Sequence, residues 1–110
     1  MKNNIYFYLL DSLIDPVLFV DTDHIIRYLN KAAVRHYSEG AALLNRSIMD
    51  CHNVESGDQI LAIFSKMKAG LEEEIITDNE KQRIFMRAVR DNDNRLVGYY
   101  ERYEQKTGVK

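Results

Sequence analysis

Cys51 and His52 are the one place in this chain where two soft metal ligands, a cysteine and a histidine, are adjacent. A thiolate and an imidazole can ligate a metal or a haem iron, and a thiolate beside a protonated histidine can be oxidised. A tetrahedral zinc site would need four donors at spacings such as Cys-x-x-Cys, which are missing. The other two histidines, His24 and His36, are predicted elsewhere on the surface. Cys51 and His52 are therefore a candidate redox or haem site, and the alternative is a small buried cysteine beside a loop histidine.

Two acidic pairs, Asp21-x-Asp23 and Asp91-x-Asp93, have the spacing with which calcium-binding loops begin. Neither has the central glycine and the twelfth-position carboxylate of such a loop, and the second meets Arg102 there. Aspartate side chains also accept hydrogen bonds from the backbone of their own turn. We therefore predict a turn at each pair and no metal site.

The sequence patterns of catalytic sites are also missing. There is no Gly-x-Ser-x-Gly, no His-Glu-x-x-His and no phosphate-binding glycine loop, and the five glycines are widely spread. Of the 110 residues, 45% are hydrophobic and 29% are charged, as in an ordinary soluble domain. We therefore predict a single domain that is not an enzyme.

Charge and hydropathy restrict the partners and the location. The formal net charge of −2 argues against non-specific nucleic-acid binding. A single cysteine excludes a disulfide within the chain. No apolar run reaches the ~20 residues of a membrane helix, and Asp11 interrupts the apolar start of the chain. We expect a cytoplasmic protein that binds neither nucleic acid nor membrane.

Residues 5–14 have helical spacing, and Asp15-Pro16 is typical of a helix end. This predicted helix has two adjacent apolar stripes, more than one buried side requires. We interpret residues 1–15 as an amphipathic dimerisation helix with the contacts Ile5, Tyr6, Leu9, Leu10 and Leu13. The alternative is a helix that wraps over its own sheet.

The rest of the chain predicts two groups of strands separated by helices. Residues 17–21 and 25–29 form an early hairpin, and Asn30 then caps a short helix over 31–37. The later segments are helical turns over 41–54, an amphipathic helix over 56–69, and strands over 72–77, 83–90 and 96–104. We predict an α+β domain over 16–104, with one antiparallel sheet and helices on one face, and a short tail of 105–110.

This order of elements, with Asp21, Asn30 and Gly98 in place, resembles a PAS domain. The likeness runs from about Leu10 to Tyr103 and includes the Asn-x-Ala-Ala opening of the first short helix and a late Leu-Val-Gly-Tyr strand. Applied to the five predicted strands, it implies a sheet in the order 2-1-5-4-3, whose concave face and helices enclose a small ligand cavity. The Cys-His pair before the long helix resembles a bacterial subgroup of the family.

The resemblance also implies a pocket and partners. We predict an apolar ligand pocket lined by Phe19, Ile26, Tyr28, Leu44, Ile48, Ile60, Phe64, Met67, Phe85 and Tyr100. The alternative for Tyr100 is a place under the N-terminal helix. PAS domains sense ligands, redox state or light, and they commonly dimerise through an N-terminal helix. We therefore expect a homodimer with an unknown small molecule and a signalling protein as further partners.

Departures from the family's patterns bear on the cofactor, whose identity the sequence leaves open. Flavin-binding photoreceptors carry a reactive cysteine where Ile48 stands, so we do not expect a covalent flavin photocycle. Many haem-binding members carry an axial histidine on the long helix, and residues 56–69 contain none. Haem therefore remains an alternative only if Cys51 and His52 are its ligands.

Three functions follow from the sequence. The first is a non-catalytic PAS sensor that binds a small ligand in an apolar cavity and signals through a dimer or partner interface. The second is a ligand-free interaction module, whose cavity is filled by its own Phe, Met and Tyr side chains. The third is a haem or thiol-redox sensor at Cys51 and His52.

Overall fold

The computed structural model describes residues 4–106. Residues 1–3 of the predicted dimerisation segment and 107–110 of the predicted tail lie outside the described residues. The elements are α1 (Ile5–Asp11), β1 (Val17–Asp21), β2 (Ile26–Leu29), α2 (Lys31–His36), the 3-10 turns η1 (Gly40–Leu43) and η2 (Ile48–Cys51), α3 (Val54–Lys68), β3 (Glu73–Asp78), β4 (Gln82–Arg90) and β5 (Leu96–Gln105). The strands form one antiparallel sheet in the order β2-β1-β5-β4-β3. The predicted fold class and strand order are confirmed.

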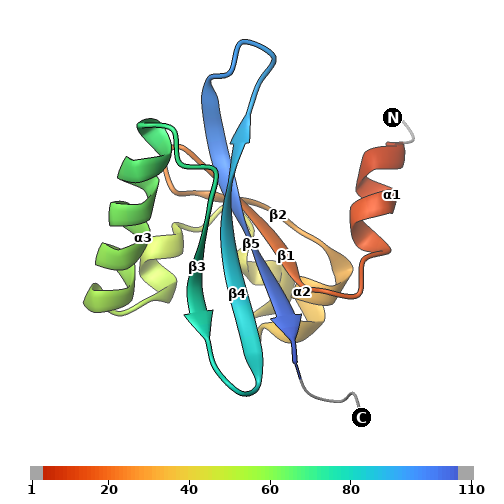
Figure 1. Ribbon diagram of the computed structural model, residues 1–110. Helices are drawn as coiled ribbons and strands as arrows, with labels where there is room; N and C mark the ends of the chain where they lie inside the picture. The colour runs from red at the N-terminus through yellow and green to blue at the C-terminus, as the bar shows by residue number, and fades with distance from the viewer. Residues whose placement is uncertain (1–3, 107–110) are drawn as a thin grey trace.

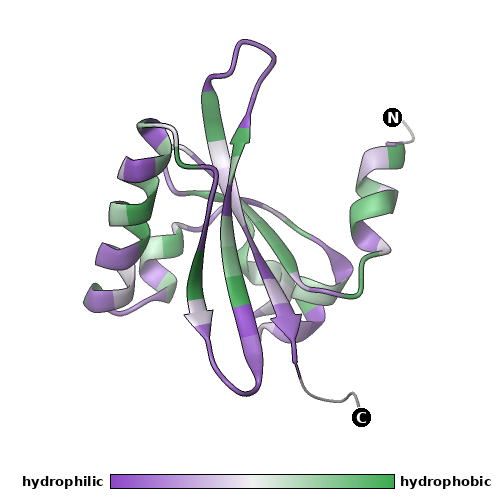
Figure 2. Cartoon of the chain, in the orientation of Figure 1, coloured by the Kyte–Doolittle hydropathy of each residue, from purple (hydrophilic) through white to green (hydrophobic). Residues whose placement is uncertain are grey.

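The two faces of this sheet are covered differently (Figure 1). α3 and the turns η1 and η2 pack on one face, here called the inner face, whereas α1 lies on the opposite, outer face. The core is on the inner face and consists of Leu18, Val20, Ile26, Leu43, Ile48, Ile60, Ile63, Phe64, Met67, Met86 and Tyr99. Figure 2 shows the matching pattern on α3, which is hydrophobic toward the sheet and hydrophilic on its other side. Each large side chain buried there contributes roughly 1.5–3 kcal/mol.

Strand β5 lies in the middle of the sheet, and its side chains alternate between the two faces. Tyr99 belongs to the inner-face core, so Glu101, two residues later, points to the inner face as well. Tyr100 and Arg102 point to the outer face, where they line a hollow under α1. Consecutive residues of one strand therefore reach both faces of the sheet.

Asn30 joins α1, β1 and α2. It is fully buried, and its Oδ1 accepts hydrogen bonds from the backbone N–H groups of Ala33 (2.8 Å) and Val17 (3.0 Å). The first of these bonds caps α2, as predicted. Its Nδ2 donates to the carbonyl oxygens of Leu10 and Asp15, both at 3.0 Å. These four bonds fix the end of α1 against the starts of β1 and α2.

The two acidic pairs close turns, as predicted. Asp21 Oδ1 accepts hydrogen bonds from the backbone N–H groups of Asp23 (2.9 Å) and Ile25 (3.1 Å). Asp91 Oδ1 makes the same two bonds to the N–H groups two and four residues further on, both at 2.9 Å. The spacing of each pair is therefore explained by the turn that it closes.

Gly98 is required by the close approach of β5 to β1. A Cβ at this position would lie 2.3 Å from the carbonyl oxygen of Val20 and 2.6 Å from the ring of Phe19. Both distances are far inside van der Waals contact, and β1 cannot retreat because β2 pairs with its other edge. The close packing of β5 against β1 therefore requires a residue without a Cβ at position 98.

One boundary of α1 and one of α3 differ from the prediction by two residues or more. α1 ends at Asp11 rather than at residue 14, because Ser12 caps it and the chain then turns toward Asn30. α3 begins at Val54 rather than at residue 56, because Asn53 accepts a hydrogen bond from a backbone N–H of the first turn at 2.8 Å. Within residues 4–106, no helix is long and apolar enough to cross a membrane.

Candidate functional site

Glu101 is an acidic side chain in the core. It is 3% exposed, and its cross-strand neighbours are Leu18 and Met86. Among residues 4–106, no group donates a hydrogen bond to its Oε2. Burial raises the pKa of this carboxyl to about 7, against the opposing effect of the His52 ring. A buried acid without a partner costs stability, and strongly shifted acids are common at functional sites.

Two small hollows flank Glu101 on the inner face, each of about 190 Å³. Glu101, His52 and Tyr103 line both of them. The first inner hollow is completed by Tyr37, Leu43, Ile48 and Cys51, and its rim includes the exposed residues Ser38 and Glu39. The second inner hollow is completed by Ser56, Gln59 and Ile60 of α3 and by residues of β3 and β4. The first therefore opens to solvent beside the predicted redox pair.

Cys51 and His52 lie at the rim of the first inner hollow. His52 Nδ1 is 2.9 Å from the carbonyl oxygen of Ile48, so Nδ1 carries a proton and Nε2 is the acceptor in the neutral ring. Cys51 is exposed, with Sγ 3.8 Å from the carbonyl oxygen of Ser47. Partial desolvation raises the pKa of the thiol, which disfavours the reactive thiolate. No three His, Cys, Asp or Glu side chains in the described part of the chain are placed to hold a metal ion.

Three tyrosines lie around Glu101. Tyr99 is fully buried, and the rings of Tyr37 and Tyr103 meet edge to face with their centroids 5.8 Å apart. Burial raises the pKa of all three hydroxyls, and the charge of Glu101 acts in the same direction. These hydroxyls therefore stay protonated near neutral pH and can donate or accept hydrogen bonds.

The prediction that His24 lies on the surface is wrong. Its backbone has a left-handed φ of 66°, and the ring is half-buried on the inner face. There Nδ1 lies 3.0 Å from Tyr99 Oη and the ring meets Phe64 at 4.8 Å. Burial lowers the pKa of His24. His36 is exposed, as predicted, with its ring 4.6 Å from that of Tyr103.

A larger, apolar hollow of about 420 Å³ lies on the outer face, between α1 and the sheet. It is lined by Phe7, Leu10, Leu13, Val17, Phe19, Tyr28, Val89, Tyr100 and Arg102. The ring of Phe7 stacks on that of Tyr28 at 5.2 Å, and the Tyr28 hydroxyl donates to Asp11 Oδ1 at 2.5 Å. Tyr28 therefore holds α1 to the sheet at one side of this outer hollow.

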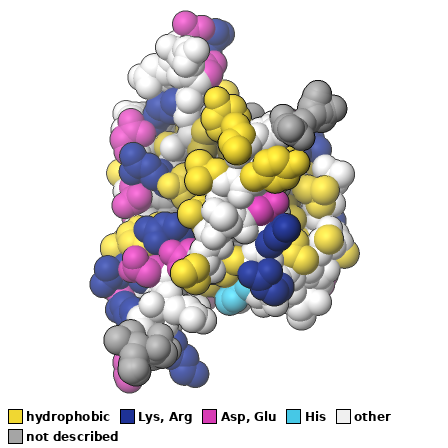
Figure 3. Space-filling view, turned by 90° about the vertical axis from the view of Figure 1, so that its right-hand side faces the viewer, with side chains coloured by type: hydrophobic (Ala, Val, Ile, Leu, Met, Phe, Trp, Pro, Cys, Tyr) yellow, Lys and Arg dark blue, Asp and Glu magenta, His cyan; other side chains and the backbone are white. Residues whose placement is uncertain are grey.

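The predicted dimer contacts are divided between two sides of α1 and the residues that follow it. Leu10 and Leu13 line the outer hollow, whereas Ile5, Tyr6 and Leu9 do not and are 67%, 73% and 61% exposed. No residue of α1 is buried. Figure 3 shows hydrophobic side chains gathered on the side of the molecule that carries this helix. An exposed apolar patch of this kind is typical of a contact surface.

The ten residues of the predicted pocket do not line one cavity. Ile26, Ile48, Ile60, Phe64 and Met67 are in the inner-face core; Phe19, Tyr28 and Tyr100 line the outer hollow; Phe85 lies under the Arg102 guanidinium at 4.3 Å; and Leu44 is exposed. The prediction of a single pocket is therefore wrong in its placement of half of these residues. The reason is that α1 covers the outer face, so apolar side chains occur on both faces of β1, β2 and β5.

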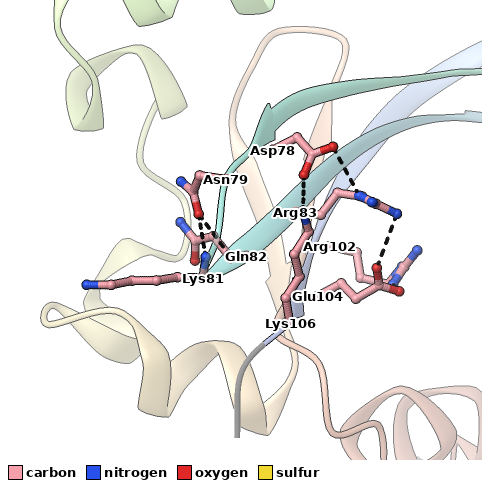
Figure 4. A network of polar contacts seen from close by, with 8 residues as sticks. All are labelled: Asp78, Asn79, Lys81, Gln82, Arg83, Arg102, Glu104 and Lys106. Atoms are coloured by element: carbon pink, nitrogen blue, oxygen red, sulfur yellow. Dashed lines mark hydrogen bonds and ion pairs between the residues drawn. The ribbon is translucent and has the colours of Figure 1, made fainter. Parts of the chain in front are cut away.

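Arg102 begins a series of ion pairs on the outer face (Figure 4). Its guanidinium lies 3.2 Å from the carboxylate of Asp15, in the α1–β1 linker, and 3.5 Å from that of Glu104. Arg83 in turn lies 3.9 Å from Glu104 and 3.5 Å from Asp78, at the β3–β4 turn. These contacts connect the linker of α1 to the end of β5.

Sequence reasoning missed Glu101 as a site residue. Its signal was the alternation along β5, because Tyr99 and Glu101 must share a face. In the predicted strand order β5 is central, so a glutamate on its helix-covered face had to be buried. Because β5 has hydrophobic residues on both of its faces, the sequence does not show which face the helices cover.

Comparison with known proteins agrees with this fold. The family model described as PAS domain matches residues 7–104. A C-terminal domain from Streptococcus mutans has a TM-score of 0.76 at 21% identity, covering 91% of this chain and 81% of that chain. A sensory box sensor histidine kinase from Vibrio cholerae has a TM-score of 0.69 at 15% identity, covering 94% and 90%.

A third similar structure is the Aer2 receptor from Vibrio cholerae, described as a dual PAS-haem oxygen sensor. Its TM-score is 0.65 at 18% identity, and the match covers 84% of this chain and 95% of that chain. Among curated proteins, no relative matches the sequence. At such identities the structural likeness shows the fold alone.

Proposed function

Because this chain belongs to the PAS domain family, we propose that it is a non-catalytic sensor with an input on the inner face of its sheet and an output on the outer face. The input is a small ligand in the first inner hollow, beside Glu101. The output is a contact between α1 and α1 of a second copy of the chain. PAS domains as a family are sensory and signalling modules, and this proposal assigns the two roles to named parts of the fold.

The alternation of side chains along β5 is the observation that carries this proposal. Glu101 lines the inner hollows, and its sequence neighbours Tyr100 and Arg102 line the outer hollow. Arg102 also pairs with Asp15 in the linker of α1. A ligand that prefers one position of β5 would therefore shift the position of α1 by its differential affinity for the two states.

A second copy of the chain is the partner that α1 supports best. Its side chains that face away from the outer hollow, Ile5, Tyr6 and Leu9, are apolar and exposed. The single charged residue of the helix, Asp11, is held by Tyr28. Two such helices can therefore meet about a two-fold axis without bringing charges together. A two-fold axis is the commonest symmetry of homodimers.

The test of the output is a charge placed on α1. We expect Leu9→Glu to convert a dimer of the full chain into a monomer in light scattering, because the carboxylate would be buried in the contact. Val54→Glu is the matched control, since Val54 is an exposed apolar residue at the start of α3 and on the other side of the molecule. A dimer that survives Leu9→Glu would refute the α1 interface.

The second candidate is a ligand-free interaction module, and the size of the inner hollows favours it. Each has about 190 Å³, less than the roughly 300 Å³ at which pockets for drug-sized ligands begin. Large side chains such as Tyr99, Met67 and Met86 fill the remaining interior. Native mass spectrometry of the chain purified from cells separates the two candidates, because a retained small mass supports the sensor and a bare chain supports the module.

Haem does not fit the residues present. The hollow beside Cys51 and His52 is smaller than a drug-sized pocket, and haem is larger than a drug-sized ligand. A thiol sensor is disfavoured as well, because the pKa of Cys51 is raised by desolvation. An oxidant response that Cys51→Ser abolished would nevertheless reinstate the thiol sensor.

A further inference from the structure

We propose that the first inner hollow binds a small organic cation that carries N–H donors, and that the Glu101 carboxylate is its anchor. This inference rests on the proposed function, because it names the chemical class of the sensor's input. Nothing in the sequence patterns of this chain points to such a ligand; the site is assembled by the strand order and by the turn that precedes α3.

Glu101 Oε2 lacks a hydrogen-bond partner among residues 4–106. Leu18 and Met86 flank it on the neighbouring strands, and among the described residues no donor reaches Oε2. An apolar residue at this position would avoid the cost of burying a polar group. A ligand that donates a hydrogen bond to Oε2 would remove that cost, and an ionised carboxylate forms stronger hydrogen bonds with charged donors than with neutral ones.

The charges around the first inner hollow favour a cation. The His52 ring opposes the rise of the Glu101 pKa, but its Nδ1 is 2.9 Å from the Ile48 carbonyl oxygen, so this proton is directed away from the carboxylate. Glu39 lines the same hollow, but its charge is neutralised by Arg46 at 2.6 Å. The carboxylate of Glu101 therefore sets the sign of the hollow, which attracts cations and disfavours anions.

The shape and lining of the first inner hollow suit a small organic cation. The rings of Tyr37 and Tyr103 line it beside the acid, and aromatic faces attract organic cations. Its volume of about 190 Å³ is the volume of about six water molecules in liquid water, at about 30 Å³ each. The ligand is therefore limited to a short chain, such as an alkylammonium ion. Access is through the rim at Ser38 and Cys51, which are exposed.

The test compares three probes of equal length with the full chain: n-butylammonium, n-butanol and butyrate. Binding is followed by amide chemical shifts on the inner face at about pH 8, where a carboxyl with a pKa of about 7 is ionised. We expect n-butylammonium to bind about ten- to a hundredfold more tightly than either other probe, as for one hydrogen bond to a charged group. Equal binding of the three probes, or a preference for butyrate, would overturn the inference.

Two variants test whether the preference for n-butylammonium depends on Glu101. Glu101→Gln keeps the shape of the side chain and should abolish the preference for n-butylammonium. Glu104→Gln makes the same change on the outer face of the same strand, three residues away, and should leave the preference intact. The pH dependence gives the same answer without a variant, because lowering the pH to about 5 protonates Glu101 and should weaken n-butylammonium binding about tenfold or more.

The outcomes separate this inference from the proposed function. A neutral or anionic small molecule retained by the chain from cells would overturn the cation but support the sensor. If no probe and no cellular molecule binds, the hollow holds water only, and both the cation and the ligand input fail. The α1 interface is judged separately, by the Leu9→Glu experiment.

Discussion

Asn30 and Glu101 are two buried polar side chains that differ in their hydrogen bonding. Both are almost completely removed from solvent, at 0% and 3% exposure. Asn30 uses its oxygen and its nitrogen in four hydrogen bonds. Glu101 has an oxygen without any donor among residues 4–106. The two side chains are therefore about equally buried, but within the described part of the chain only Asn30 has hydrogen-bond partners for both of its polar atoms.

This difference teaches how to separate polar groups that maintain a fold from those that serve a function. A satisfied group such as Asn30 repays its burial in the folded state. An unsatisfied group such as Glu101 weakens the folded state, so its presence calls for a reason outside stability. The following changes test whether the two residues differ in this way.

The largest expected effect is on Asn30. Asn30→Ala should lower the free energy of unfolding by about 4 kcal/mol, at about 1 kcal/mol for each of four bonds. Urea denaturation measures it. The matched control is Asn53→Ala, which removes one exposed cap bond of α3 and should cost about 1 kcal/mol. Equal losses in the two variants would mean that Asn30 is an ordinary helix cap.

The next effect is the pH dependence that Glu101 confers. Its pKa is raised from 4.5 to about 7 on folding, so between these values the folded state binds more protons than the unfolded state. Stability must therefore fall as the pH rises from 4.5 to about 7 and be unaffected by this group above that range. At about 1.4 kcal/mol for each pKa unit, the decline is on the order of 3 kcal/mol.

This decline is measured by urea denaturation at several pH values. The groups that face Glu101 are His52, Cys51, Tyr37, Tyr99 and Tyr103, and the tyrosines do not ionise in this range. Glu101→Gln should remove the decline and leave the contribution of the other groups. A variant with an unchanged pH profile would show that Glu101 is not the group that titrates.

A third change should stabilise the protein. Glu101→Met replaces the unsatisfied acid by an apolar side chain between Leu18 and Met86, and it should raise the free energy of unfolding by about 2 kcal/mol at about pH 8. Glu104→Met, on the outer face of β5, lacks this gain because Glu104 has ion-pair partners there. Destabilisation by Glu101→Met would mean that the acid is a structural group like Asn30.

The smallest effect concerns Arg102, a polar side chain on the outer face. Arg102→Ala removes the contact with Asp15 and the stacking on Phe85, and it should cost about 1 kcal/mol. Arg95→Ala is the control, because the partners of Arg95 are in an exposed turn and its loss should change stability very little. If Arg102→Ala leaves the dimer unchanged while Leu9→Glu disrupts it, Arg102 does not couple the sheet to α1.

Much of the fold could be predicted from local patterns. The strand segments, the turns at Asp21 and Asp91 and the cap at Asn30 depend on neighbouring residues in the chain, which the sequence displays. The site could not be predicted in the same way. An aromatic residue such as Phe19 or Tyr100 suits a pocket on either face, and only the position of α1 shows that these two line the outer hollow.

By itself, the sequence determined the helices and strands, the likeness to the family and the high apolar content of the first helix. These follow from periodicity and from residue types close together in the chain. The tertiary structure alone decided which face each strand residue occupies, that His24 turns inward and that, among the described residues, none donates to Glu101 Oε2. Those facts depend on which distant segments meet across the sheet, and the period of two along a strand gives both faces without saying which of them is covered.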